Sequence, residues 1–466
     1  MGTYFVDTNF RSTPLELGGL FREPIALVIV SESNVIPTAL LFSRYRAFRE
    51  TTRLDLAPLT VIIGKNGGGK SVLTRMPLLL ASGLSSDAEA PLDLNAGGIN
   101  HAARYEDLIY QRSAQPFMLG AEISDGEKIY EFRTTLLHVV ENHTLAIEAF
   151  DLFECGERIV SLKARPEDIG GAQGAFVARF GLDGAEHPVN VLTAGLFPTA
   201  VSGQATLSNR LLACRNLFEK AFQDPSYLGP FRSEQGLLTR IPRQGVHDLG
   251  PRGERALDIL GDNRLRGDGA LVDDVENWFE SEMGGNRVKL EMAGDIPRML
   301  VHDPIRNLDI DIGETGAGFA QLFPIVVQAY ARRSDAIKGP IIIVEQPELH
   351  LHPAAHGSVA DLIGTIAATR RDGVRYVCET HSEQFVTRLR RRIAESLFPA
   401  DTVRIVSVGH QTTVEDEIEP LRMIEIDKLG NPDAWPVGVF DEAFDDLVEL
   451  RKAAQLRVAS EAPEGA

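Results

Sequence analysis

The segment "TVIIGKNGGGKS", residues 60–71, constrains the fold of this chain more than any other feature. Its last eight residues match G-x-x-x-x-G-K-[ST], the pattern of a phosphate-binding loop, and they follow an apolar strand and open a helix, as the pattern requires. Glycines let the backbone curl so that successive N–H groups point at phosphate oxygens, and a helix N-terminus adds partial positive charge. The sequence therefore predicts an α/β fold with a nucleotide site, rather than a flexible glycine-rich turn.

This loop predicts ATP and Mg²⁺ as ligands. Lys70 is expected to bridge the β- and γ-phosphates, and Ser71 to ligate Mg²⁺. The other loop residues are expected to contact phosphate through the backbone: Gly64, Lys65, Asn66, Gly67, Gly68 and Gly69.

A second segment, "IIIVEQPELHLHP" at residues 341–353, is typical of the second half of a nucleotide-binding site. It predicts a buried parallel strand that ends in an acid, Glu345. Ligands of open α/β sheets gather at the carboxyl ends of the strands, so the Glu345 carboxylate is expected to hold Mg²⁺ through a water. The alternative, an ordinary solvated strand end, is disfavoured by the loop upstream.

The remaining pattern predicts a head over residues 38–398 with a β-rich and helical insertion at about 120–300. An N-terminal extension (1–37) precedes it, and a small C-terminal α+β region with a tail (399–466) follows. Alternating apolar residues predict an antiparallel meander from 117 to 164, whereas the Gly- and Ala-rich stretch 166–206 predicts surface loops. Pro77 is expected to divide the helix that starts at Lys70. Further helices are predicted at 207–222, 271–283, 317–333, 354–369 and 382–397, and further strands at 375–380, 403–408 and 420–426.

Composition narrows the class of protein. The chain is 44% hydrophobic and 24% charged, as in a soluble globular protein. Its formal charge of −19 disfavours a surface that coats nucleic acid non-specifically, although a local basic groove stays open. The three cysteines are isolated, no apolar run approaches the ~20 residues of a membrane span, and no signal-peptide pattern is present. We therefore expect a cytoplasmic protein without a membrane partner.

Four segments in this order resemble the ABC-type ATPases of the overcoming-lysogenization-defect and RecF-like, SMC-related group. They are "SRYRAFRETTRLDLAPLTVIIGKNGGGKS", "GETGAGFAQLFPIVV", "IIIVEQPELHLHP" and "CETHSEQFVTRLRRRI", with shorter matches at "YLGPFR" and "GPRGERALDIL". The end of the chain, from residue 425, resembles a small C-terminal domain of unknown function found in one subgroup. The resemblance implies an ABC-type P-loop ATPase head, with a mixed RecA-like sheet flanked by helices and an antiparallel β lobe. It also implies a homodimer or higher oligomer in which two heads sandwich ATP.

In that group the signature segment, here residues 313–327, contacts the γ-phosphate held by the partner head. The resemblance places Thr315, Gly316, Gly318 and Gln321 at the nucleotide. Ala320 stands where the group usually has serine, so a hydroxyl contact is either missing or supplied by Thr315.

The resemblance also assigns the groups around the attacking water. Aligned on Pro347, Gln346 occupies the place of the acid that acts as general base, and an amide cannot take a proton. One hypothesis makes Glu348 the base, with Gln346 orienting the water and His381 near the γ-phosphate. The other is slow hydrolysis by an ATP-gated clamp. The E-Q-P-E order common in the subgroup favours Glu348.

Three weaker features have alternative interpretations. Gln111 is a candidate for the glutamine that senses Mg²⁺ and the γ-phosphate. The histidines of "HLHPAAH" are spaced for zinc, but in this group they lie in a loop that crosses to the partner, which favours dimer contacts or structural hydrogen bonds. The arginines of "TRLRRRI" form either a DNA- or nucleotide-facing patch or a solvated helix face that balances nearby acids, and we favour the latter.

Relatives of this subgroup occur in bacterial antiphage defence modules beside an effector or nuclease. Because only about 85 residues follow His381, a fused nuclease does not fit, and the effector is expected to be a separate protein. Two alternatives stay open: a RecF-like repair or recombination ATPase that clamps DNA, and a non-hydrolysing ATP-gated scaffold.

Overall fold

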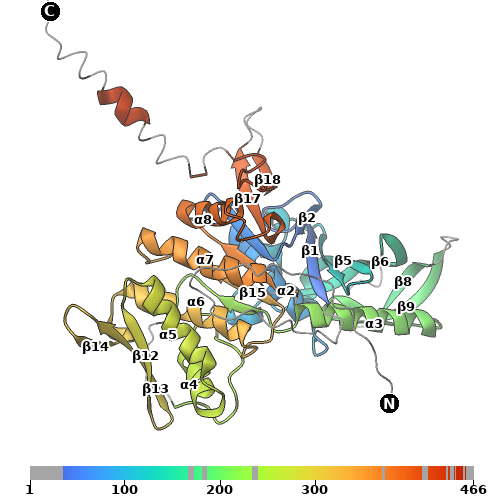
Figure 1. Cartoon of the computed structure of the whole chain (residues 1–466). Coiled ribbons are helices and arrows are strands. Elements are labelled where there is room, and N and C mark those ends of the chain that lie inside the picture. The colour runs from blue at the N-terminus through green and yellow to red at the C-terminus, as the bar shows by residue number, and fades with distance from the viewer. Residues whose placement is uncertain are drawn as a thin grey trace, which may run out of the picture.

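The computed structural model describes residues 35–165, 173–180, 186–233, 240–369, 373–411, 418–436 and 439–440, together with 446, 448–454 and 457. The N-terminal extension predicted at 1–37 therefore lies almost wholly outside the described residues. The described chain forms three sheets with helices packed on and between them (Figure 1). None of its described helices is both long and apolar enough to cross a membrane.

A six-stranded sheet carries the phosphate-binding loop. Its order is β11 (Ser226–Leu228), β15 (Ile341–Glu345), β16 (Arg375–Glu379), β3 (Leu59–Gly64), β17 (Val403–Gln411) and β18 (Ile418–Ile424). All neighbouring pairs are parallel except β17 and β18. Parallel neighbours bring their carboxyl ends to one edge of the sheet, so the ends of β3, β15 and β16 meet there.

Both faces of this sheet are buried, which explains why its strands are continuous aliphatic runs. In β3, Ile62 joins one hydrophobic cluster, while Val61 and Ile63 join the other. The first cluster includes the nine-stranded sheet described below with α1 (Lys70–Thr74), α2 (Met76–Leu84) and α3 (Ala205–Phe222). Because side chains alternate along a strand, each strand packs against both layers.

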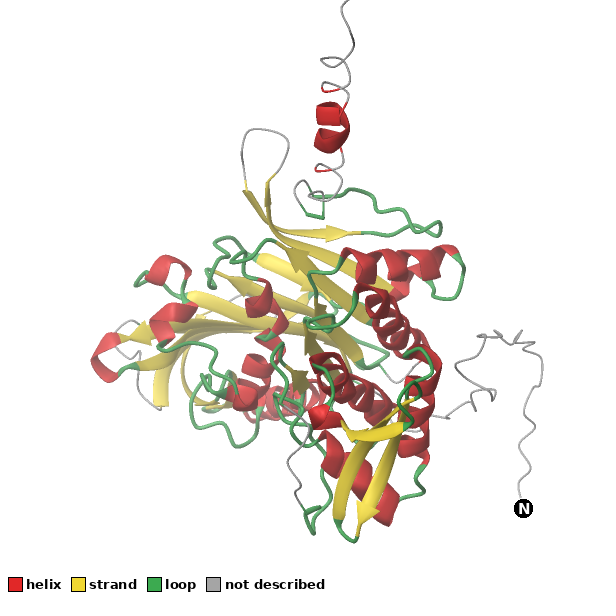
Figure 2. Cartoon of the chain, turned by 90° about the vertical axis from the view of Figure 1, so that its left-hand side faces the viewer, coloured by secondary structure: helices red, strands yellow, loops and turns green. Residues whose placement is uncertain are grey.

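Helices cover the second face. They are α4 (Ala256–Arg266), α5 (Ala270–Glu282), α6 (Ala317–Arg333), α7 (Pro353–Thr369) and α8 (Glu383–Ala394). Figure 2 shows them gathered to one side of the central strands. The helices predicted at 271–283, 317–333, 354–369 and 382–397 are confirmed. The division of the first helix is confirmed too, because α1 and α2 are separated at Arg75 and Pro77 lies in the first turn of α2.

A nine-stranded antiparallel sheet forms the β lobe. Its order is β10 (Phe197–Val201), β9 (Glu186–Ala194), β8 (Gln173–Phe180), β7 (Glu157–Ala164), β6 (Thr144–Glu154), β5 (Ile129–Val139), β4 (Phe117–Ser124), β1 (Ile36–Ser43) and β2 (Thr52–Asp55). The predicted meander is confirmed as β4 to β7. The prediction of surface loops over 166–206 is wrong for β8, β9 and β10, because each finds hydrogen-bonding partners in an existing sheet edge. Residues 166–172 and 181–185 lie outside the described part.

A third sheet, of β12 (Arg287–Ala293), β13 (Ile296–Asp303) and β14 (Leu308–Asp311), packs beside α4 and α5. Figure 1 shows it at the opposite end of the molecule from β8 and β9.

The predicted C-terminal region contributes to the central sheet. β17 pairs in parallel with β3, and β18 pairs with β17, so both lie in the same sheet as the loop strand. The predicted boundary at 398/399 therefore falls between two elements of one core. Beyond β18, residues 448–454 are helical, and most of the acidic segment before them lies outside the described residues.

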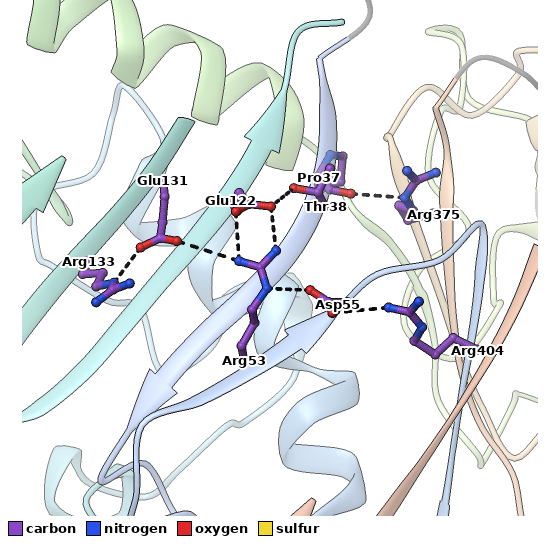
Figure 3. Close-up of polar contacts among 9 residues, drawn as sticks. All are labelled: Pro37, Thr38, Arg53, Asp55, Glu122, Glu131, Arg133, Arg375 and Arg404. Atoms are coloured by element: carbon purple, nitrogen blue, oxygen red, sulfur yellow. Dashed lines mark hydrogen bonds and ion pairs between the residues drawn. The ribbon is translucent and has the colours of Figure 1, made fainter. Parts of the chain in front are cut away.

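A polar network joins the two large sheets (Figure 3). Arg53 on β2 donates to both Glu122 oxygens on β4 at 2.7 and 2.9 Å and to Asp55 at 2.6 Å. Asp55 also lies 3.4 Å from Arg404 on β17. Arg375 on β16 donates to the Pro37 carbonyl at 3.1 Å, so two arginines of the central sheet reach the β lobe.

Candidate functional site

The phosphate-binding loop has the backbone that its glycines allow. Gly64 and Gly69 have φ of 139° and 102°, which L side chains rarely adopt. A Cβ at Gly64 would lie 2.3 Å from the carbonyl oxygen of Val408 on β17, so only glycine fits there. Lys65, Asn66 and Gly67 are exposed, which leaves the outer side of the loop open to a ligand.

Lys70 lies folded against its own loop. Its Nζ donates to the carbonyls of Gly64 at 2.9 Å and Lys65 at 2.8 Å, and the residue is only 4% exposed. Burial lowers the pKa of Lys70, an effect that the nearby Glu379 carboxylate opposes. A phosphate would replace two neutral acceptors with charged oxygens, which make stronger hydrogen bonds.

Two carboxylates, Glu345 and Glu379, end the neighbouring strands β15 and β16, where they are directly paired in register. Glu345, the predicted Mg²⁺ ligand, is held by Arg75, whose Nε and Nη2 donate to its two oxygens at 2.5 and 2.6 Å. Ser71 Oγ instead donates to Glu379 at 3.2 Å. Burial raises the pKa of Glu379, and the neighbouring Glu345 charge adds to that effect.

The turn after β15 carries the predicted catalytic groups. Gln346 has a left-handed φ of 46°, and its backbone N–H donates to the Glu379 carbonyl at 2.7 Å. Non-glycine residues held in this region cluster at functional sites. Glu348 is 9% exposed, and its Oε1 accepts from the backbone N–H of His381 at 2.6 Å. Its Oε2 has no hydrogen-bond partner among the described residues. The structure thus brings Glu348 and His381 together.

His381 is exposed at the end of β16, on the same edge as the loop. Burial of part of the ring lowers its pKa, and the Lys70 charge lowers it further. The ring is therefore neutral at pH 7.

Arg232, the last residue of "YLGPFR", is a buried cation behind this turn that sequence analysis did not assign. It is 3% exposed, and its Nη2 donates to the carbonyls of Glu345 at 2.8 Å and Gln346 at 3.3 Å. Its Nε and Nη1 have no partner among the described residues, and burial lowers its pKa to about 10. The match of "YLGPFR" to the group was the available signal, but nothing local connects it to residues more than 100 positions away.

The signature segment starts α6. Gly316 is the N-cap residue of that helix, is exposed, and has open space around it. The side chain of Thr315 donates to the Ile312 carbonyl at 2.6 Å, and Gly318 lies beside the backbone of His350.

Two further positions of the signature segment make contacts within their own chain. Ala320 is buried, so its side chain does not face a partner. Gln321 pairs reciprocally with the backbone of Arg232, at 3.1 and 3.2 Å, and so links the signature helix to the turn after β15.

The hydrogen bond that Gln111 makes does not involve these groups. It lies in a 3-10 turn with a φ of 54°, and its Nε2 donates to the neighbouring Tyr110 hydroxyl at 3.3 Å. Within the described part of the chain, no hydrogen bond or ion pair joins it to Ser71 or Glu345, so its predicted role as a metal sensor stays a prediction.

The histidine loop makes structural hydrogen bonds. His356 contacts the Ser382 hydroxyl at 2.8 Å and the Leu351 carbonyl at 3.4 Å, and His352 Nδ1 accepts from the Ala354 N–H. Over the residues that the structure describes, no group of three or more His, Cys, Asp or Glu side chains is arranged to hold a metal ion. These contacts agree with the structural interpretation of the loop.

Acidic neighbours pair with three of the four arginines of the basic helix α8. Arg388 and Arg392 both pair with Asp361 of α7 at 2.6 Å, and Arg391 and Arg392 pair with Glu395. These contacts support the interpretation of a helix face that balances nearby acids.

A cavity of about 1060 Å³ opens between α2, the end of α3 and residues 242–248. Its lining includes Tyr227 and His247 but none of residues 64–71, so this cavity is separate from the phosphate-binding loop.

The strand order and the loop define the class of protein. The loop strand β3 and the acid-ended strand β15 flank β16, with helices on the outer face and an antiparallel lobe on the other. This is the mixed α/β fold of ABC-type P-loop ATPase heads, as predicted. A family model described as "AAA domain, putative AbiEii toxin, Type IV TA system" matches residues 59–387, and the chain belongs to that family.

Three solved structures of SMC heads are distantly similar. A head bound to the C-winged helix domain of ScpA is 13% identical, covers 84% of this chain and 98% of its own, and has a TM-score of 0.47. The head from Thermotoga maritima is 10% identical, with coverage of 84% and 99% and a TM-score of 0.40. A Pyrococcus furiosus head with an extended coiled coil is 13% identical, with coverage of 90% and 100% and a TM-score of 0.42. These scores are too low to transfer any property of those proteins. No curated protein matches the sequence.

Proposed function

We propose that this chain hydrolyses ATP, dimerises on nucleotide and controls a separate effector or nuclease in bacterial antiphage defence. The observation that carries the hydrolytic step is the Glu348 carboxylate. One of its oxygens is fixed by the His381 N–H, and the other lacks a partner among the described residues. A buried, oriented carboxylate with a free oxygen is suited to accept a proton from water.

Nucleotide binding begins at the loop. Lys70 exchanges the Gly64 and Lys65 carbonyls for the β- and γ-phosphates, and the exposed loop backbone surrounds them. Because α1 has only five residues, we assign phosphate binding to Lys70 and the loop amides rather than to a long helix dipole.

The donor set beside the loop fits Mg²⁺, a hard cation that binds oxygen. The hydroxyl of Ser71 and one carboxylate at the ends of β15 and β16, either Glu345 or Glu379, are the protein groups that would hold it. When bound, Mg²⁺ supplies neutralisation of the charge on the β- and γ-phosphate oxygens.

The turn after β15 supplies groups for hydrolysis. Glu348 Oε2 accepts a proton as the water oxygen forms its bond to the γ-phosphorus. The bond from phosphorus to the bridging oxygen breaks, its electron pair leaves with ADP, and the protonated Glu348 then returns its proton to solvent. Gln346 orients the water, and the neutral His381 ring hydrogen-bonds at the γ-phosphate.

Dimerisation uses the signature segment. Gly316 at the exposed start of α6 has free space around it, so a partner's nucleotide can approach its backbone. Because Arg388, Arg391 and Arg392 of α8 are paired with acids, this helix does not favour the DNA-clamp alternative.

The test is steady-state ATP turnover with Mg²⁺, compared among the unmodified protein, Lys70→Ala and Glu348→Gln. Glu383→Gln, which changes an exposed acid on α8 in the same way, is the control. Lys70→Ala should lose nucleotide affinity by about 10–100-fold, the worth of a charged hydrogen bond. Glu348→Gln should bind ATP normally, dimerise in light scattering, and turn over about 10²–10⁴-fold more slowly.

Other outcomes select the alternatives. ATP binding with no turnover in the unmodified protein supports the scaffold, and strong stimulation by duplex DNA supports the DNA clamp. Unchanged turnover in Glu348→Gln removes Glu348 as the base.

A further inference from the structure

The two carboxylates that end β15 and β16 lie in equivalent positions. Glu345 and Glu379 are partners in register, and they are 1% and 3% exposed. On each strand the residue two before the acid, Ile343 or Val377, belongs to the hydrophobic cluster on the α1 side. Because side chains alternate, both carboxylates point to that side, toward the helix that carries Ser71.

Glu345 is already engaged by a cation. The guanidinium of Arg75 donates to both of its oxygens, in the bidentate arrangement that makes arginine–carboxylate pairs strong and directional. Arg75 is itself held in place, because its guanidinium lies over the ring of Tyr227 on β11 at 5.9 Å. To reach a metal at Ser71, Glu345 would have to leave this bidentate partner.

Glu379 has different neighbours. Its two oxygens accept from hydroxyls, Ser71 Oγ at 3.2 Å and Thr74 Oγ1 at 3.4 Å. A hydroxyl gives up such a hydrogen bond at small cost, because the serine oxygen can turn its lone pairs to a cation that the carboxylate also binds. Thr74 keeps a second acceptor, the Lys70 carbonyl at 3.1 Å.

We propose that Glu379, with Ser71, is the carboxylate that takes Mg²⁺ in this protein, and that Glu345 serves instead as the buried partner of Arg75. The metal-facing acid thus lies on the strand next to β3 and not on the strand one position further away. This inference rests on the proposed ATP site and specifies how that site holds its cation.

The test uses Mn²⁺ as a paramagnetic substitute for Mg²⁺, with a non-hydrolysable ATP analogue, so that its readout is metal binding and not turnover. Free Mn²⁺ is measured by electron paramagnetic resonance in titrations of the unmodified protein, Ser71→Ala, Glu379→Gln and Glu345→Gln. We expect Glu379→Gln to weaken Mn²⁺ binding by about 10–100-fold, as Ser71→Ala does, because loss of groups that support a metal has effects of this size. Glu345→Gln should keep the Mn²⁺ affinity and lower the melting temperature, because Arg75 loses its partner.

The opposite pattern, with Mn²⁺ affinity lost in Glu345→Gln and kept in Glu379→Gln, overturns the proposal. If Glu379→Gln does not fold, Glu379→Asp keeps the charge on a shorter side chain and should still weaken Mn²⁺ binding; unchanged affinity there counts against the proposal. Binding of the ATP analogue, measured in EDTA, distinguishes failure of the proposed ATP site from failure of the role proposed for Glu379. If the unmodified protein does not bind the analogue, the proposed ATP site fails, whereas binding with the wrong metal pattern overturns only the role of Glu379.

Discussion

The nine-stranded sheet and the carboxyl edge of the six-stranded sheet bury opposite kinds of side chain. In the first, the ring of Phe132 lies 4.8 Å from Phe218, 5.6 Å from Phe197 and 6.4 Å from Phe150, centroid to centroid. At the carboxyl edge of the second, charged groups are buried instead: Lys70, Arg232, Glu345, Glu348 and Glu379. Apolar burial stabilises a fold, whereas a buried charge destabilises it unless it is well paired.

This difference separates the region that stabilises the fold from the region that binds ligand. Aromatic rings hold the β lobe together but offer no group that binds phosphate or moves a proton. The charges at the edge of the central sheet are only partly satisfied, as the unpaired atoms of Arg232 and Glu348 show for the described residues. Mutations should therefore affect stability in the lobe and ligand binding or turnover at the edge.

The largest effect is expected in the lobe. Phe132→Ala should reduce the free energy of unfolding by about 3–5 kcal/mol, because it removes a fully buried ring and leaves a cavity. Urea unfolding measures this loss, and nucleotide affinity of the folded fraction should not change. Phe132→Leu is the matched control, with a smaller loss. A parallel fall in affinity would contradict the separation.

Arg232→Met should affect turnover more than stability, the reverse of what we expect for Phe132→Ala. Methionine of similar length removes a buried charge but also its hydrogen bonds to two carbonyls, and because these effects oppose each other, stability should fall less than in Phe132→Ala. Turnover should fall by about 10–100-fold, because the carbonyls of Glu345 and Gln346 lose a charged donor that fixes the catalytic turn. Turnover and the urea midpoint are measured on the same preparations. A large loss of stability with normal specific turnover would make Arg232 a structural residue.

The decrease in ATP turnover at acidic pH should report protonation of the His381 ring. Because its pKa is lowered, the ring stays neutral down to and below the ordinary value of about 6.5, and protonation lowers turnover only at more acidic pH. We expect constant turnover from pH 8 to about 6.5 and a decline below that, on the order of tenfold, which His381→Gln should flatten. A decline that begins above pH 7 would mean a raised pKa and would contradict this assignment.

The smallest effect is expected between the two sheets. Asp55→Asn weakens the contacts with Arg53 and Arg404, which are about a third exposed, so it should cost about 0.2–1 kcal/mol and less at high salt. Thr52→Ser, on the same strand, is a control that leaves these charges intact. A change in nucleotide affinity from Asp55→Asn would show that the lobe and the site are coupled through this network.

The local sequence pattern was sufficient to predict many of the helices and strands. The strand at 341–345 and the helix at 317–333 have the predicted bounds, because a fully buried strand and an amphipathic helix are each encoded by their own residues. The strands β8 to β10 were missed, since Gly- and Ala-rich segments show little alternation and form strands here by pairing with a neighbouring edge.

The sequence by itself determined the phosphate-binding loop and its glycines, because their backbone requirements are local, and it identified the acids at 345 and 348. Only the tertiary structure decided which groups meet. Arg75 and Glu345 are 270 residues apart, and Ser71 and Glu379 are 308 apart. The order of β15, β16 and β3 brings them together, and no local pattern encodes the order of strands in a sheet.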